Sequence, residues 1–364
     1  MKEAHLQQLP LWAWLWPVLA LVLGAGALAT GAAPAWLLLL AAVLLGGAVF
    51  AAVHHAEIVA LRVGQPLGSL LLAVAVTVIE VSLIATLMLA GAEGSEEVAR
   101  DAVFSAVMIV LNGVIGLCLL LGGRRHHEQV FRLDAASGAM AVLGVLATFV
   151  LILPNYVPSG GEHRFSSLQL IAVAVVTFLL YVVFLFVQTV RHRDYFLPLA
   201  AAGKHAEPHA PPLPKVLRAS AILLPLSLIA VIMLAKLLSF PLDSAVDAAG
   251  LPQSVVGVVI AAVVLTPEGL AATLSAIRND LQNSINLVLG SALASIGLTI
   301  PVVTAIAIGT GRPLTLGLSA EHQVLLLLTL FTSLLTLGTG RTTILQGAVH
   351  LGIFVIFLVL SIVP

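Results

Sequence analysis

Two glutamates in apolar surroundings are the residues whose chemistry stands out. Glu80 and Glu268 are each the only charged residue in a long apolar-rich stretch, 63–92 for the first and 248–277 for the second. A charge at that depth in a bilayer costs about 3 kcal/mol on insertion scales. We expect a chain with two such charges to use both, since carboxylates inside a membrane bind cations or exchange protons.

The composition indicates a membrane protein. The 364 residues are 60% hydrophobic and 9% charged, with a mean hydropathy of +1.13, which leaves too few polar residues to cover a water-soluble surface. Soluble enzymes are therefore excluded. A net charge of −1 without basic clusters argues against nucleic acid as a partner. The single cysteine, Cys118, offers no disulfide or cysteine metal site.

The two glutamates must be positioned by membrane-spanning helices. A helix crosses the hydrocarbon layer with about 20 residues. Segmenting the chain on that length predicts eleven spans: 11–30, 36–60, 68–91, 102–122, 135–153, 167–189, 217–238, 253–276, 283–308, 321–339 and 342–362. We interpret the first as a retained helix and not a signal peptide, because it lacks a cleavage motif and further spans follow. Gly338, Gly340 and Arg341 provide the break between the last two spans.

The loop charges indicate the orientation. Cytoplasmic loops collect Lys and Arg. With a cytoplasmic N-terminus, twelve basic residues fall on the inner side, and only Arg100, Arg164 and Arg312 fall on the outer side. This bias predicts a cytoplasmic N-terminus and a periplasmic C-terminus.

An internal repeat relates the two glutamates. Glu80 lies in the third span and Glu268 in the eighth, and residues 110–113 (VLNG) and 288–291 (VLGS) correspond in the following spans. Because a unit of five spans is odd, the second unit must be inverted. Inverted repeats are typical of transporters, with the substrate site near the midplane.

The predicted fold is an all-α polytopic membrane protein with 11 transmembrane helices, one leading helix plus two inverted-topology five-helix repeats. The expected parts are an N-terminal segment with the leading helix (1–35), a first repeat (36–190), a cytoplasmic linker rich in proline and histidine (191–216) and a second repeat (217–364).

Two carboxylates that meet at the repeat axis could share one cation. Hard cations such as Ca²⁺ take about six to eight oxygen ligands. The side chains placed to contribute oxygens beside Glu80 and Glu268 are Asn112, Ser291, Thr77 and Thr266. We also expect Pro267 to break its helix and free backbone carbonyls. Without the cation the carboxylates repel each other and lose solvation, so protons replace the metal.

Further polar residues could form a proton or cation pathway. The candidates are His54, His55, Glu57 and His350. The alternatives are a solvated interfacial position for the first three and a satisfied interhelical hydrogen bond for His350. Four acids in an outer loop, Glu93, Glu96, Glu97 and Asp101, either attract cations or form a plain solvated loop.

Several segments resemble a known family. The segments are 55–58 (HAEI), 62–70 (RVGQPLGSL), 79–84 (IEVSLI), 266–269 (TPEG), 298–301 (LTIP), 338–343 (GTGRTT) and 347–351 (GAVHL), with Asn286 and the pair Gly290–Ser291. They resemble the cation/proton exchanger (CAX) family of the calcium/cation antiporter superfamily, in particular the bacterial ChaA-type calcium/sodium(potassium)-proton antiporters.

The resemblance implies a bacterial inner-membrane protein that exports Ca²⁺, and Na⁺ or K⁺, against entering protons. It implies Glu80 and Glu268 as paired ligands, with Asn112 and Ser291 as the polar residues on the following helices. It implies no cofactor, and partners limited to the lipid bilayer, inorganic cations and protons; a homo-oligomer stays open.

Two other functions remain as alternatives. A sodium/calcium exchanger usually has more intramembrane acids than the two found here. An intramembrane metalloenzyme would need a ligand set such as H-E-x-x-H, which the sequence lacks. The expectation is therefore a transporter and not an enzyme.

Overall fold

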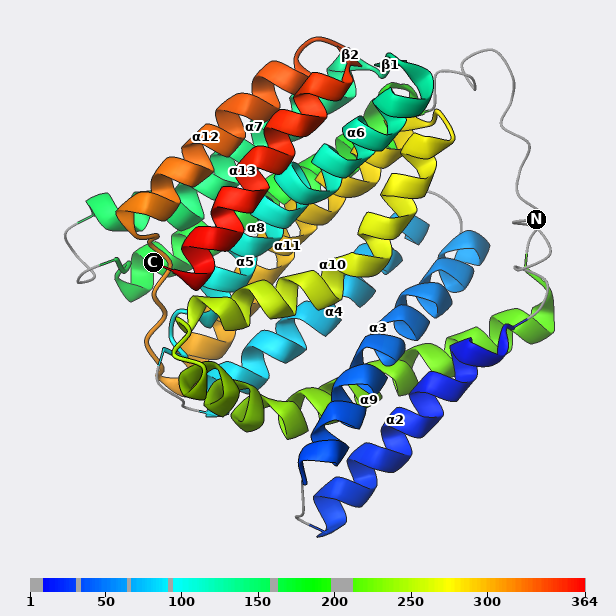
Figure 1. Cartoon of the computed structure of the whole chain (residues 1–364), viewed down its shortest axis with the longest axis vertical. Coiled ribbons are helices and arrows are strands. Elements are labelled where there is room, and N and C mark those ends of the chain that lie inside the picture. Colours follow the sequence, from blue (N-terminus) through cyan, green and yellow to red (C-terminus); the bar gives the residue numbers. More distant parts are fainter. Residues whose placement is uncertain are drawn as a thin grey trace. The chain divides into compact units, whose positions relative to one another are not determined.

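The computed structural model describes residues 9–30, 34–63, 67–90, 94–157, 163–197 and 212–363. Within these ranges, eleven helical segments are long and apolar enough to cross a membrane, and they follow the predicted order (Figure 1). The prediction of eleven spans is confirmed. The described residues fall into two compact units, one from 1–95 with 207–250 and the other from 96–206 with 251–364.

Four helices lie in the described part of the first unit. They are α2 (Leu11–Thr30), α3 (Ala35–Val63), α4 (Leu67–Ala90) and α9 (Pro214–Ala248). Helix α3 packs against the other three. Gly47 of α3 makes its contact with α2 possible, because a Cβ atom there would lie 2.3 Å from the ring of Trp16.

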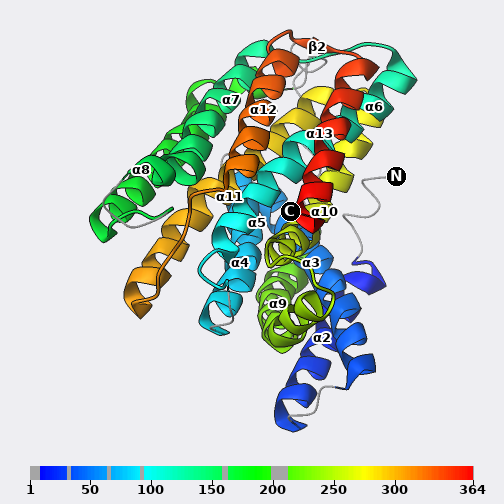
Figure 2. The same cartoon turned by 60° about the vertical axis from the view of Figure 1, so that its left-hand side comes forward.

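The second unit contains the remaining helices and one short sheet. The elements are α5 (Val98–Met108), η1 (Ile109–Val114), α6 (Ile115–His126), β1 (Gln129–Val130), α7 (Leu133–Ala147), η2 (Thr148–Ile152), η3 (Leu153–Tyr156), α8 (Ser167–Phe186), η4 (Val187–Arg191), η5 (Arg193–Phe196), α10 (Ser254–Ile277), α11 (Leu281–Thr310), α12 (Ala320–Leu337), β2 (Arg341–Thr342) and α13 (Ile344–Ile362). Helix α13 lies beside α6, and α12 lies beside α7 (Figures 1 and 2). The strands β1 and β2 pair antiparallel.

Three expectations from the sequence need comment. The expected break of the eighth span at Pro267 is wrong: α10 is one helix through this residue, although it bends along its length (Figure 1). Helix α9 is also longer than expected, with 35 residues. Of the predicted linker 191–216, residues 198–211 lie outside the described residues.

Helices α5 and α6 form one span that is not α-helical throughout. Six residues between them, Ile109–Val114, form the π-helical turn η1, with Asn112 near its centre. A π-helical turn holds an extra residue, which weakens the regular hydrogen-bond ladder, and such turns occur often at functional sites. The sequence offers no local signal for this turn.

Close approaches of helix backbones in the second unit depend on glycine. A Cβ atom at Gly347 of α13 would lie 2.5 Å from the backbone N of Leu120 and 2.9 Å from the carbonyl oxygen of Gly116, both in α6. Small residues permit such contacts between membrane helices. Helices α6 and α13 therefore touch backbone to backbone.

The connecting loops of the second unit make a reciprocal set of contacts. In the loop between α6 and α7, Gln129 donates to the carbonyl oxygen of Ala276, before the loop from α10 to α11, and β1 pairs with β2 in the loop from α12 to α13. In the loop between α11 and α12, the Thr315 amide donates to Glu96 O, before α5, and the Gly317 amide donates to His163 O, before α8.

These contacts relate equivalent loops of the two predicted five-helix repeats. The loop between the third and fourth helices of each repeat binds the second-to-third and fourth-to-fifth loops of the other repeat. This reciprocal pattern is consistent with inverted repeats, and it joins loops of the two predicted repeats at both ends of the second unit.

Candidate functional site

Glu268 has a polar partner on the neighbouring helix. It lies half-buried in α10, and the hydroxyl of Ser291, on α11, donates a hydrogen bond to Glu268 Oε2. The next residue, Gly269, approaches η1, because a Cβ atom there would lie 3.1 Å from Cγ2 of Val114. The structure thus brings together Glu268 and Ser291, and places η1 beside them.

Asn112 is fully buried in η1, and both ends of its amide are hydrogen-bonded. Its Nδ2 donates to Oγ1 of Thr329 at 2.9 Å, and its Oδ1 lies 3.1 Å from Nδ1 of His350. Nε2 of the same ring lies 3.1 Å from Oγ1 of Thr336. The partners come from α12 and α13, so Asn112 joins three segments of the second unit.

Sequence reasoning missed the two threonines that support Asn112. Thr329, Ser333 and Thr336 follow a spacing of four and three residues in the apolar helix α12, and all three are buried. This spacing places them on one helix face. Such a polar stripe in a predicted span could have indicated a buried polar network, but not its partners.

Glu80 and Thr77 lie on α4 of the first unit. Their exposed fractions are 5% and 6%. They are three residues apart on a helix and therefore share one face. A buried carboxylate with a hydroxyl one turn away has the ligand types that a hard cation requires.

Thr266 does not share the face of Glu268. Two residues apart on a helix, their side chains point about 200° apart. The Thr266 side chain is exposed, and its hydroxyl donates to the carbonyl oxygen of Ala262 in the same helix. The structure therefore does not place Thr266 with Glu268 as a ligand. Pro267 lacks an N–H, so the carbonyl of Val263 has no donor at the usual helical position.

The histidines of α3 have different surroundings. His55 is fully buried, with Nε2 2.9 Å from the carbonyl oxygen of Ala13 and Nδ1 3.1 Å from Oγ of Ser220. A carbonyl only accepts, so Nε2 carries a proton. His55 thus links α3 to α2 and α9. The ring of His54 lies 4.9 Å from that of Trp12, and Glu57 is exposed.

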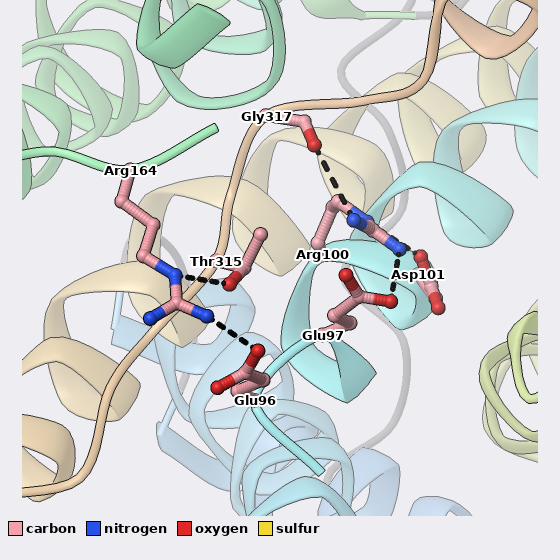
Figure 3. A network of polar contacts seen from close by, with 7 residues as sticks. All are labelled: Glu96, Glu97, Arg100, Asp101, Arg164, Thr315 and Gly317. Atoms are coloured by element: carbon pink, nitrogen blue, oxygen red, sulfur yellow. Dashed lines mark hydrogen bonds and ion pairs between the residues drawn. The ribbon is translucent and has the colours of Figure 1, made fainter. Parts of the chain in front are cut away.

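The acids predicted to lie in an outer loop do not form an open acidic surface in the described residues. Arg100 donates to Asp101 at 2.7 Å, to Glu97 at 3.0 Å and to the carbonyl oxygen of Gly317 at 3.4 Å (Figure 3). Asp101 is only 5% exposed. The fourth acid of the predicted group, Glu93, lies outside the described residues.

A second arginine neutralises the neighbouring acid. Arg164 forms an ion pair with Glu96, and its Nε donates to Oγ1 of Thr315 at 2.9 Å (Figure 3). The two arginines join the segments before α5, α8 and α12. The expectation of a plain solvated loop is therefore wrong for Asp101, which is buried beside its neighbour Arg100, whereas Glu96 and Glu97 stay partly exposed and pair with Arg164 and Arg100.

Comparison with known proteins agrees with the arrangement of spans. The family described as sodium/calcium exchanger protein matches residues 33–190 and 219–363. The chain is 60% identical over 365 residues to the y4hA protein of Sinorhizobium fredii, covering 100% of this chain and 98% of that protein. It is 36% identical over 322 residues to the sodium-potassium/proton antiporter ChaA of Escherichia coli, covering 88% and 87%.

A solved structure shares the fold. Native YfkE superimposes with a TM-score of 0.72 at 19% identity, over 97% of this chain and 100% of that chain. Proteins of this family are multi-pass membrane transporters and not enzymes, and the ions that they carry are substrates and not cofactors. The chain belongs to the sodium/calcium exchanger protein family, in its branch of cation/proton exchangers.

Proposed function

We propose that this protein is a secondary antiporter that exports Ca²⁺, and Na⁺ or K⁺, across the bacterial inner membrane in exchange for protons. One observation carries this proposal: Glu268 lies within a membrane-spanning helix and accepts a hydrogen bond from Ser291. The family description includes calcium and sodium, and the ChaA relative is named for sodium, potassium and protons.

The transported cation is shared by Glu80 and Glu268 in one midplane site, with one glutamate from each repeat. Two carboxylates balance the charge of one Ca²⁺ ion, and two protons neutralise the same carboxylates. Either occupied form is neutral, whereas the empty form holds two negative charges in a medium of low dielectric. The site therefore exchanges one occupant for the other.

A serine beside Glu268 suits both forms of the site. A hydroxyl has one donor hydrogen and two acceptor lone pairs. Ser291 donates to the ionised carboxylate, as in the described contact, and can accept from the protonated carboxyl. Its oxygen is also a ligand type that Ca²⁺ and Na⁺ accept. At Ser291, replacement of cation by proton thus needs only a rotation of its hydroxyl.

The basic loops support a cytoplasmic N-terminus and a periplasmic C-terminus. The site then receives cation from the cytoplasm and protons from the periplasm. The immediate partners are the lipid bilayer, inorganic cations and protons.

Everted membrane vesicles with an acidic lumen test the exchange. A pH-sensitive dye reports protons leaving the lumen when Ca²⁺, Na⁺ or K⁺ is added outside. We expect rapid proton efflux with the wild type and none with Glu80→Gln or Glu268→Gln. Glu128→Gln is the matched control, because Glu128 is a half-exposed loop carboxylate that pairs with Arg341.

The outcomes separate the possible functions. Normal exchange by either site variant would rule out the shared site. Calcium uptake driven by a sodium gradient, with no response of the pH dye, would instead identify sodium/calcium exchange.

A further inference from the structure

The π-helical turn η1 is held from outside by a buried group of side chains. Asn112 in η1 contacts Thr329 and His350, and Thr336 contacts the far side of the His350 ring. None of these four side chains is more than 3% exposed. The ring of His350 also interacts with the backbone of Leu111, next to Asn112. We name Thr329, Thr336 and His350 the η1 clamp.

Every polar group of the clamp has a complementary partner. His350 Nδ1 donates to Asn112 Oδ1, and His350 Nε2 accepts from the hydroxyl of Thr336. The Asn112 amide donates one hydrogen to Thr329 and directs the other toward Sδ of Met108, at 3.8 Å. A fully satisfied buried network of this kind fixes one geometry, because any rotation leaves a buried donor or acceptor without a partner.

The opposite side of η1 faces the part of α10 that carries Glu268. Val114 lies two residues after Asn112 and contacts the position of Gly269, which directly follows Glu268. Helix α13 contacts η1, and α10 also contacts η1. The clamp and the helix that carries Glu268 therefore contact the same short turn.

We infer that His350, supported by Thr336, is a positioning residue for ion exchange that holds Asn112 and the π-helical turn η1 in register with Glu268. His350 does not bind the transported ion in this role, because both of its ring nitrogens are engaged by protein groups. The inference rests on the proposed function and adds residues of α12 and α13 to the machinery.

Loss of the clamp should weaken cation binding more than it weakens the fold. Outer partners of metal ligands typically contribute about 10- to 100-fold in metal affinity. For His350→Ala we therefore expect the half-saturating Ca²⁺ concentration for dye-monitored exchange to rise about 10- to 100-fold. A merely structural role would lower the amount of folded protein and leave half-saturation unchanged.

Conservative pairs separate positioning from folding. Thr336→Val removes the hydroxyl partner of His350 at nearly constant volume, whereas Thr336→Ser retains it. We expect raised half-saturation for the valine variant and wild-type behaviour for the serine variant. Ser361→Ala on α13, the helix of His350, is the control, because the Ser361 hydroxyl bonds only to Phe357 O in the described contacts.

A double variant tests whether His350 acts through Asn112. If it does, His350→Ala adds nothing to the effect of Asn112→Ala. Additive effects, or normal half-saturation in His350→Ala, would overturn the inference. If His350→Ala does not fold, the Thr336 pair decides, and equal half-saturation in its two variants would overturn it. Failure of the wild type to exchange cations for protons would instead refute the proposed function.

Discussion

Replacing Gly347 with alanine should push helices α6 and α13 apart. The new Cβ atom would lie 2.5 Å from the backbone N of Leu120, and ordinary contact begins at 3.4 Å, so relief requires a displacement of about 0.9 Å (3.4 − 2.5). Backbone atoms of a helix cannot rotate away. Such a shift would also stretch the 3.1 Å contact between His350 and Asn112 beyond hydrogen-bonding distance.

The expected loss of stability is moderate. Overpacking costs about 1–3 kcal/mol, and the better helix propensity of alanine offsets at most about 1 kcal/mol. A net loss of about 1–2 kcal/mol lowers the melting temperature by about 2–6 °C. Gly352→Ala is the matched control on the same helix, because no heavy atom lies within 4 Å of its Cβ position among the described residues. It should raise the melting temperature slightly or leave it unchanged.

The chain has its own reporter for this measurement. Cys118 is the only cysteine and is 2% exposed. A thiol-reactive fluorescent dye therefore reports unfolding of purified protein in detergent. Equal melting temperatures for Gly347→Ala and Gly352→Ala would refute the close backbone contact. A lower melting temperature with unchanged cation affinity would show that the contact between α6 and α13 does not control the position of Asn112.

Three further predictions concern the site and the loops. Ser291→Ala should raise the half-saturating Ca²⁺ concentration about tenfold in the vesicle assay, because a group that hydrogen-bonds to a metal ligand contributes on that scale to metal affinity. Ser291→Thr retains the hydroxyl and should stay near wild type. Apparent Ca²⁺ affinity should fall as pH falls, by about tenfold per pH unit for each competing proton, and a flat affinity from about pH 6 to about pH 9 would contradict direct competition. Arg100→Ala should lower the melting temperature more than Arg164→Ala. The first removes the countercharge of buried Asp101, which costs about 3–5 kcal/mol of stability, and the second breaks a half-exposed pair, which costs about 0–1 kcal/mol. Equal shifts in the dye assay would contradict this ranking.

Hydropathy predicted the spans well because the bilayer imposes one length and one polarity on each of them. It predicted the end of α9 poorly: the span was expected to stop at residue 238, but the helix continues to Ala248. Hydropathy reports where a chain meets lipid, whereas a helix can continue into the interface. The break before α13 was predicted from its two glycines. One of them, Gly340, adopts a positive φ of 71°, which residues other than glycine rarely take.

The candidate site was predictable only in part. The apolar surroundings of Glu268 identified it, and the predicted repeat identified Ser291 on the following helix. The partners of Asn112 were not predictable, because Thr329 follows it by 217 residues and His350 by 238. Likewise, Arg164 follows Glu96 by 68 residues, so no pattern in the sequence indicates that the acid is neutralised.

The reciprocal loop contacts have a consequence for the order of events during synthesis. The loop after α6 pairs with β2 in the loop after α12, where Arg341 follows Glu128 by 213 residues. A ribosome adds about 5–20 residues per second, so at least about ten seconds separate the insertion of these loops. The spans before α9 therefore remain in the membrane with this loop unpaired, and their packing is completed only when α12 and β2 have emerged.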